Sequence, residues 1–261
     1  MNGCFSNIRG LFHLVQYHFS VFFRKIRSYP PLVGWILYLG ISYRQTPLNM
    51  VQDYSASAMI SFFMMVWFGY VFLSDFDATT EHLLLLQINN RFLYAASKVI
   101  FLVAVCVLVS LIGVVYPIII EIISHLAGVA WPVGVGVTDF FGGLLLHFVV
   151  GCLGASAAFL FQPNPDKRSN SPITAFALML FAIIAVAKHQ IFSFDGLARH
   201  ILLVFTPLYE ILQMFPDRET FVAGDMLLTI IKGGIYFLVA VVVGYWLYNK
   251  RVYGLLLAKH K

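Results

Sequence analysis

Long, nearly uncharged apolar runs constrain this chain more than any other feature. Of its 261 residues, 60% are hydrophobic and only 11% are charged, whereas soluble domains have about a quarter of their residues charged. So few charges cannot cover a soluble surface, and the runs therefore predict helices that cross a membrane. The predicted spans lie near 31–46, 56–73, 99–123, 140–161, 172–188 and 226–247.

The sequence thus predicts an all-α, polytopic membrane protein, with 1–261 as a single transmembrane domain of six helices. The first span is the shortest, because the unbroken apolar part, 32–43, falls short of the roughly 20 residues needed to cross a bilayer. Whether it crosses fully or re-enters stays open at this point. The net charge of +5 reflects basic residues at the ends of apolar runs. They orient spans, so nucleic acid is not an expected partner.

The segment 5–27 has a helical period with one apolar and one basic side. Such a helix is expected to lie in the headgroup region rather than to span. The proline pair Pro30-Pro31 should end it, since proline disfavours helix in the preceding residue. The apolar stripe consists of Phe5, Ile8, Phe12, Val15, Phe19, Phe22 and Ile26.

The distribution of lysine and arginine predicts the orientation of the spans. With the N-terminus inside, most basic residues fall in the inside segments, including those near both ends of the chain. The bias favours six spans with both termini cytoplasmic, in a bacterial inner or plasma membrane.

Two connections between spans carry further signals. Residues 77–92 predict a short leucine-rich helix between the second and third spans, with Asp77 and two threonines able to cap its start and Glu81 near the positive end of its dipole. Residues 189–224 contain two short apolar patches separated by Pro207, which predict extracellular or re-entrant helices.

No catalytic, cofactor-binding or metal-ligating pattern is recognisable, and there is no phosphate-binding loop. The ionisable Glu121 and Lys232 lie within predicted spans, where they either line an export path or pair to stabilise the bundle. In the second span, Phe62, Met65 and Phe68 belong to an adaptable apolar surface, either a substrate path or part of the core or lipid-facing surface.

Small residues inside the apolar runs favour close packing of helices. The pairs Gly142-Gly143 and Gly233-Gly234 are expected to lie at helix contacts. Cys106 and Cys152 also lie inside apolar runs, where a free cysteine behaves as a small hydrophobic residue.

The order of these features resembles the ABC-2 type transporter permease family along the whole chain. The resemblance is most specific in the loop between the second and third spans, where the family has a threonine, an acid, a leucine-rich run, a turn with an arginine, and a lysine that starts the third span. The corresponding positions here are Thr79, Glu81, Leu83–Leu86, Asn89-Asn90-Arg91 and Lys98. The proline of the family's turn is absent, and Gln87-Ile88 stands in that region.

The resemblance implies the transmembrane subunit of an ATP-driven exporter. The subunit would pair with a second copy and with separate ATP-binding subunits that carry ATP and Mg, so the chain itself would not be an enzyme. The resemblance also implies that 77–92 is the cytoplasmic coupling helix. The residues expected to contact the ATPase are Thr79, Glu81, Leu84, Leu85, Asn89, Asn90 and Arg91.

The apolar, aromatic second span favours a hydrophobic or amphipathic substrate, such as a peptide, toxin or drug. Two alternatives remain: export of a lipid-linked glycan or lipid, and a non-transporting membrane protein that serves in immunity or assembly. An ATPase subunit that co-purifies with the chain would favour transport.

Overall fold

The computed structural model describes residues 2–43, 49–74, 78–88, 90–128, 136–162, 171–191, 207–215 and 218–258. Every regular element within these ranges is a helix, which confirms the all-α prediction. The elements are α1 (Asn2–Phe23), the 3-10 turn η1 (Ile26–Ser28), α2 (Tyr29–Ser42), α3 (Met50–Ser74), α4 (Ala78–Ile88), α5 (Arg91–Leu126), α6 (Val137–Leu160), α7 (Ser171–Ile191), α9 (Leu208–Leu212) and α10 (Ala223–Ala258).

Four helices are long and apolar enough to cross a membrane: Met50–Ser74, Arg91–Leu126, Val137–Leu160 and Ala223–Lys250. They are typical of a helical membrane protein, as the sequence predicts. Helix α2 has 14 residues, and the apolar part of α7, Pro172–Ala187, is also shorter than the roughly 20 residues of a full crossing. The six-span topology therefore stays a prediction.

Helix α5 is longer than the predicted third span. It begins at Arg91, because the Asn90 side chain accepts a hydrogen bond from Leu93 N (3.1 Å) and caps the helix start. Its 36 residues correspond to about 54 Å at 1.5 Å per residue, against a hydrocarbon core of about 30 Å. Arg91 therefore lies in the first turn of α5, whereas the sequence places it in a coupling helix over 77–92; the observed short helix, α4, ends at Ile88.

Helices α3 and α6 pack closely along their lengths, because small residues line the contact. A Cβ added at Gly154 of α6 would lie 2.5 Å from the carbonyl oxygen of Phe62, and one added at Gly69 of α3 would lie 2.5 Å from the Ala158 Cβ. Helix α10 packs on the other side of α6, where Gly233 faces Val149. The predicted role of a glycine in helix packing is thus confirmed at Gly233.

Helix α1 packs against α5, but it does not use the whole predicted stripe. The helix ends at Phe23, so the chain leaves the helical period before Ile26, which is exposed. Phe22 packs on Phe68 and Phe101, with ring centroids 5.4 Å apart in each pair, whereas Phe12 is 68% exposed. Rings of α3 and α5 therefore decide which part of the stripe is buried.

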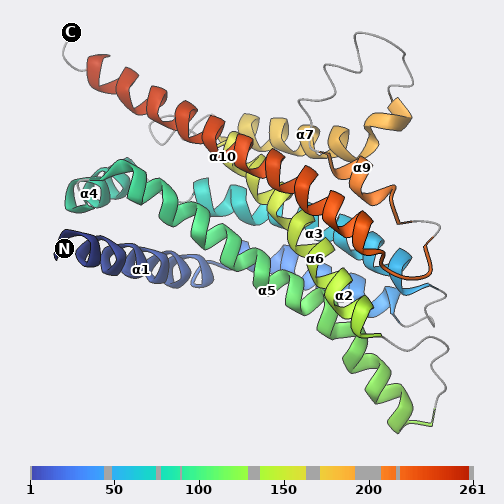
Figure 1. Ribbon diagram of the computed structural model, residues 1–261. Coiled ribbons are helices and arrows are strands. Elements are labelled where there is room, and N and C mark those ends of the chain that lie inside the picture. Colours follow the sequence, from blue (N-terminus) through green and yellow to red (C-terminus); the bar gives the residue numbers. More distant parts are fainter. Residues whose placement is uncertain are drawn as a thin grey trace.

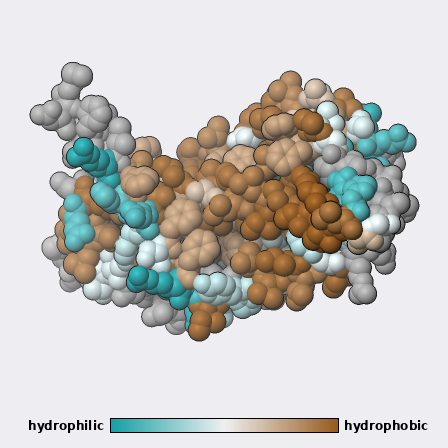
Figure 2. Space-filling view, turned by 90° about the horizontal axis from the view of Figure 1, so that it is seen from below, coloured by the Kyte–Doolittle hydropathy of each residue, from teal (hydrophilic) through white to brown (hydrophobic). Residues whose placement is uncertain are grey.

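Apolar side chains also cover much of the outer surface, as expected for helices in contact with lipid. Figure 2 shows hydrophobic residues across the middle of one face and hydrophilic residues towards its ends. The start of α1, helix α4 and the last described turns of α10 lie at the same end of the molecule (Figure 1).

The second of the two short patches in 189–224 forms α9, which begins directly after Pro207. The first patch, 197–205, lies outside the described residues. Helix α10 begins at Ala223, three residues before the predicted span.

Candidate functional site

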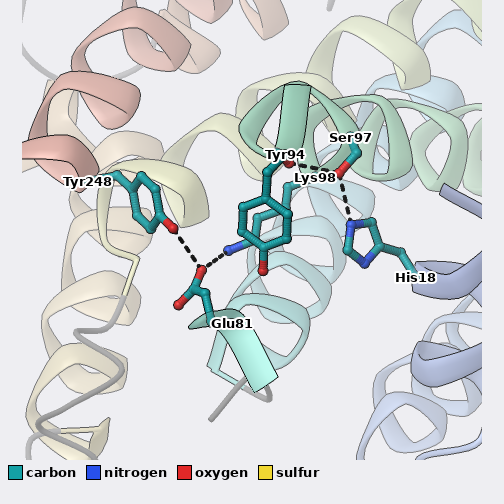
Figure 3. A network of polar contacts seen from close by, with 6 residues as sticks. All are labelled: His18, Glu81, Tyr94, Ser97, Lys98 and Tyr248. Carbon is teal, nitrogen blue, oxygen red and sulfur yellow. Dashed lines mark hydrogen bonds and ion pairs between the residues drawn. The ribbon is translucent and has the colours of Figure 1, made fainter. Parts of the chain in front are cut away.

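Helix α4 is joined to α5 by an ion pair inside the protein. Glu81 lies in the first turn of α4 and Lys98 in the second turn of α5. Lys98 Nζ donates a hydrogen bond to Glu81 Oε1 at 2.6 Å, and the two side chains are 2% and 5% exposed, respectively (Figure 3). A carboxylate and an ammonium buried this deeply are stable only as a pair, since either one alone would be an uncompensated charge.

Helix α10 contributes to the same pair from a distant part of the sequence. Tyr248 donates its hydroxyl proton to Glu81 Oε1 at 3.1 Å, so this single oxygen accepts from α5 and from α10 (Figure 3). Lys98 Nζ also lies 4.5 Å from the ring centroid of Tyr94 and 5.2 Å from that of Tyr248. The aromatic faces partly replace the water that the ammonium has lost.

Helix α1 contacts α5 at Ser97, the residue directly before Lys98. Ser97 Oγ donates to the Tyr94 carbonyl oxygen at 2.7 Å, so its oxygen accepts a hydrogen bond from His18 Nε2 at 3.0 Å. Burial and the nearby Lys98 ammonium lower the pKa of His18 to about 3. His18 is therefore neutral at pH 7, with the proton on Nε2.

The four helices α1, α4, α5 and α10 thus meet in one polar network. We call the six residues drawn in Figure 3 the α4 network: His18, Glu81, Tyr94, Ser97, Lys98 and Tyr248. Because their polar contacts lie among buried side chains, displacement of α4 must either carry α5 and α10 with it or break buried bonds.

The sequence-predicted coupling residues fall into different environments. Glu81 points into the α4 network rather than outwards, and Leu84 packs against the hydrophobic core. Leu85 is half-buried, whereas its neighbours Leu83 and Leu86 are 57% and 77% exposed. The exposed leucines of α4 are therefore Leu83 and Leu86, whereas the sequence predicts Leu84 and Leu85 as the contact residues.

The remaining predicted coupling residues lie at the ends of α4. Thr79 is exposed in the first turn. Asn90 caps α5, and Arg91 is half-buried at the start of that helix. Asn89 lies outside the described residues.

The residues of the candidate substrate path lie in different environments. Phe62, Met65 and Phe68 are buried in the core, which favours the core alternative for them. Glu121 lies 4.0 Å from His125 on its own helix, and Lys232 is exposed on α10. An apolar groove of about 390 Å³ lies elsewhere, between α5 and α6, lined by Val107, Ser110, Leu111, Phe141, Leu144, Leu145 and Phe148.

Sequence reasoning missed four members of the α4 network: His18, Tyr94, Ser97 and Tyr248. The family-like spacing of Glu81 and Lys98 was the only signal for the pair, and Tyr248 follows Glu81 by 167 positions with no local pattern to connect them. Among the described residues, no three His, Cys, Asp or Glu side chains gather to hold a metal ion.

The fold defines a helical protein with four candidate membrane spans and a short helix held between two of them. No family model matches the sequence, and no curated protein matches it.

Proposed function

We propose that this chain is the transmembrane subunit of an ABC-2 type exporter that moves a hydrophobic or amphipathic substrate out of the cell. The observation that carries the proposal is the placement of α4. It is a short helix between two candidate spans, and its Glu81 is bonded to Lys98 of one span and to Tyr248 of another.

In this mechanism the α4 network transmits force. ATP-driven closure of the partner subunits pushes on α4, and the Glu81 carboxylate transfers the displacement to α5 and α10. Removing one partner of a buried ion pair typically costs about 3–5 kcal/mol. Small forces therefore tilt the joined helices instead of separating them.

The partner ATPase is expected to contact the exposed side of α4. Leu83 and Leu86 lie on that side, and their apolar surface is available in the isolated chain. The contact residues of the proposal are accordingly Leu83, Leu86 and Thr79, while Glu81 and Leu84 hold α4 to the bundle.

The assembly consists of two copies of this chain with two ATP-binding subunits, which bind ATP and Mg. Helices α2 and α7 complete six spans, and α1 lies in the inner interface of a bacterial inner or plasma membrane. Both termini are cytoplasmic in this arrangement, on the same side as α4. This placement of the termini is supported by the position of the start of α1, helix α4 and the last described turns of α10 at one end of the molecule (Figure 1).

Co-expression with candidate ATP-binding subunits tests the function. An ATPase that co-purifies with the chain, and whose hydrolysis in proteoliposomes drives substrate movement, supports the proposal. A correctly inserted chain that captures no ATP-binding subunit would reject it and favour the non-transporting alternative.

A tyrosine pair on α10 tests the transmission step. Tyr248→Phe removes the hydroxyl that bonds Glu81, and we expect ATP hydrolysis to continue while transport per ATP falls. Tyr245→Phe is the matched control, because it removes a hydroxyl from the same helix at a residue that packs on Phe92. Equal transport by the two variants would exclude Tyr248 from coupling.

The topology has its own test. Single cysteines at Ser193 and Asp217, both outside the described residues, should react with an impermeant thiol reagent added to intact cells. Labelling of both only after lysis would contradict the six-span arrangement.

A further inference from the structure

One side of α10 is exposed along most of the helix. Only 22% of the most apolar stretch of α10 is buried inside the protein, against 78% for α6. Six exposed residues of α10 recur at alternating steps of four and three, so they lie on one line along the helix. We call them the α10 stripe: Leu228, Lys232, Ile235, Val239, Val242 and Trp246. Its five apolar members are between 47% and 66% exposed, so the stripe is a surface that lipid or another molecule covers.

Lys232 is the charged member of the α10 stripe, and it lies inside a candidate span. Asp225, in the first turn of α10, precedes it by seven positions on the same side of the helix, which is about 10 Å along the axis. Helical side chains lean towards the N-terminal end of their helix, so the Lys232 side chain extends towards the end that carries Asp225. An ammonium at this depth is costly unless it reaches a polar partner.

The nearby polar groups of α10 are already engaged. Asp225 is the only acidic residue of this helix, and its Oδ2 pairs with Arg218 Nη2 at 3.2 Å. Thr229 Oγ1 donates to the Asp225 carbonyl oxygen at 2.9 Å, so this hydroxyl bonds within its own helix. Within the part of the chain that the structure describes, no carboxylate lies within ion-pair distance of Lys232. The negative charge that Lys232 requires therefore comes from outside these residues.

The charge of Lys232 also distinguishes between the molecules that could cover the stripe. If two copies of α10 packed on each other about a two-fold axis along the membrane normal, the same residues of both copies would meet. The two Lys232 ammonium groups would then face each other in an apolar contact, which is unfavourable. A membrane phospholipid instead has an anionic headgroup next to apolar chains, in the order in which the stripe presents Lys232 and then aliphatic side chains.

We propose that the α10 stripe binds one anionic phospholipid. The lipid phosphate pairs with the Lys232 ammonium, and an acyl chain lies along Ile235, Val239 and Val242. This assignment gives Lys232 its counter-charge and covers the aliphatic part of the stripe with one molecule.

The experiment uses the full-length chain, purified in a neutral detergent and freed of lipid. Phosphatidylglycerol is added, and native mass spectrometry counts the bound molecules. We expect one lipid to bind more tightly than any further ones. Phosphatidylcholine with the same acyl chains has a phosphate but no net charge, and diacylglycerol has neither, so both should bind more weakly. Inorganic phosphate should not displace the lipid.

Variants test the two parts of the site. Lys232→Met should weaken phosphatidylglycerol binding about fivefold, the usual contribution of one basic residue at an anionic membrane surface. Lys232→Arg keeps the charge and should keep the affinity. Lys250→Met is the matched control, because Lys250 is an exposed lysine near the other end of α10, where its Nζ lies 4.2 Å from the ring centroid of Trp246. Its affinity should equal that of the wild type.

A phosphatidylglycerol with a photoreactive group in its acyl chain locates the site. We expect the label on the peptide that contains Ile235 and Val242, and we expect it to decrease in Lys232→Met. Equal affinity of wild type and Lys232→Met, equal affinity for diacylglycerol, or labelling of other helices alone would overturn the proposal. A stable dimer that excludes the label from α10 would overturn it too, and would assign the stripe to a second copy. The measurement needs no ATPase partner, so its outcome is independent of the proposed transport function.

Discussion

Lys98 Nζ lies 2.6 Å from Glu81 Oε1, and this buried contact joins the first turn of α4 to the second turn of α5. The same carboxylate oxygen accepts the Tyr248 hydroxyl from the last turns of α10. The Glu81 side chain therefore bonds α4 to two candidate spans.

Breaking the Glu81–Lys98 pair should destabilise the protein strongly. We expect Lys98→Met to lower the free energy of unfolding by about 3–5 kcal/mol, because Glu81 would remain as a buried, unpaired charge. Arg218→Ala is the control: its ion pair with Asp225 involves an arginine that is 50% exposed, and such a pair is worth about 1 kcal/mol or less. Denaturation in detergent measures both, and equal losses would contradict the role of burial.

Substitutions along α4 should separate partner binding from folding. Leu86→Asp places a charge on the exposed side, so we expect the chain to fold normally and to lose capture of the ATPase. Leu84→Asp places a charge against the core and should destabilise the chain itself. A pull-down combined with a thermal unfolding assay compares them. Retained capture by a folded Leu86→Asp chain would remove this surface from the proposal.

Stability should depend on pH through His18. Its pKa is about 3 in the folded chain, against 6.5 for an unperturbed histidine, so the unfolded chain binds the proton more readily. The contribution of neutral His18 to the free energy of unfolding is complete above pH 6.5. It declines by about 1.4 kcal/mol per pH unit as the pH falls towards 3. His18→Gln should flatten this decline, while His13→Gln, at an exposed position, should keep it. Parallel pH profiles for wild type and His18→Gln would refute the assignment.

Glycine substitutions should report on the α3–α6 contact. Gly154→Ala introduces a Cβ 2.5 Å from the Phe62 carbonyl oxygen, and we expect a loss of about 1–3 kcal/mol because the backbones must move apart. Gly234→Ala meets no atom within 4 Å, so it should be neutral or stabilising by up to about 1 kcal/mol. Denaturant titration of the two variants measures the difference, and a neutral Gly154→Ala would show that the contact tolerates added volume.

The sequence by itself determined the features that depend on local composition and period. Runs such as 99–123 and 140–161 contain so few polar groups that they are stable only in an apolar environment. In the structure they form most of α5 and α6. Asn90 starts α5 because its side chain accepts a hydrogen bond from the backbone N–H of Leu93, which is also a local property. Gly142, Gly143 and Gly233 lie at close contacts for the same reason, since small side chains permit close approach, whereas Gly234 meets no atom within 4 Å.

The sequence only partly predicted where helices end and which of their residues face the core. The stripe in α1 is apolar over its length, yet Phe22 is buried and Phe12 is exposed. Four consecutive leucines in α4 cover most of the helix circumference, so the sequence has no means of choosing between Leu84 and Leu86. Packing against the hydrophobic core, which Leu84 contacts, makes that choice.

Only the tertiary structure decided the composition of the α4 network. Glu81 and Tyr248 are 167 positions apart, and no period or propensity relates them. His18 is not part of the predicted apolar stripe, yet it packs on Phe72 and Phe101 beside Phe22, and Ser97 supplies the hydrogen-bond partner that makes its burial stable. Burial of polar groups depends on partners from other helices, and therefore only the packed bundle shows which of them are paired.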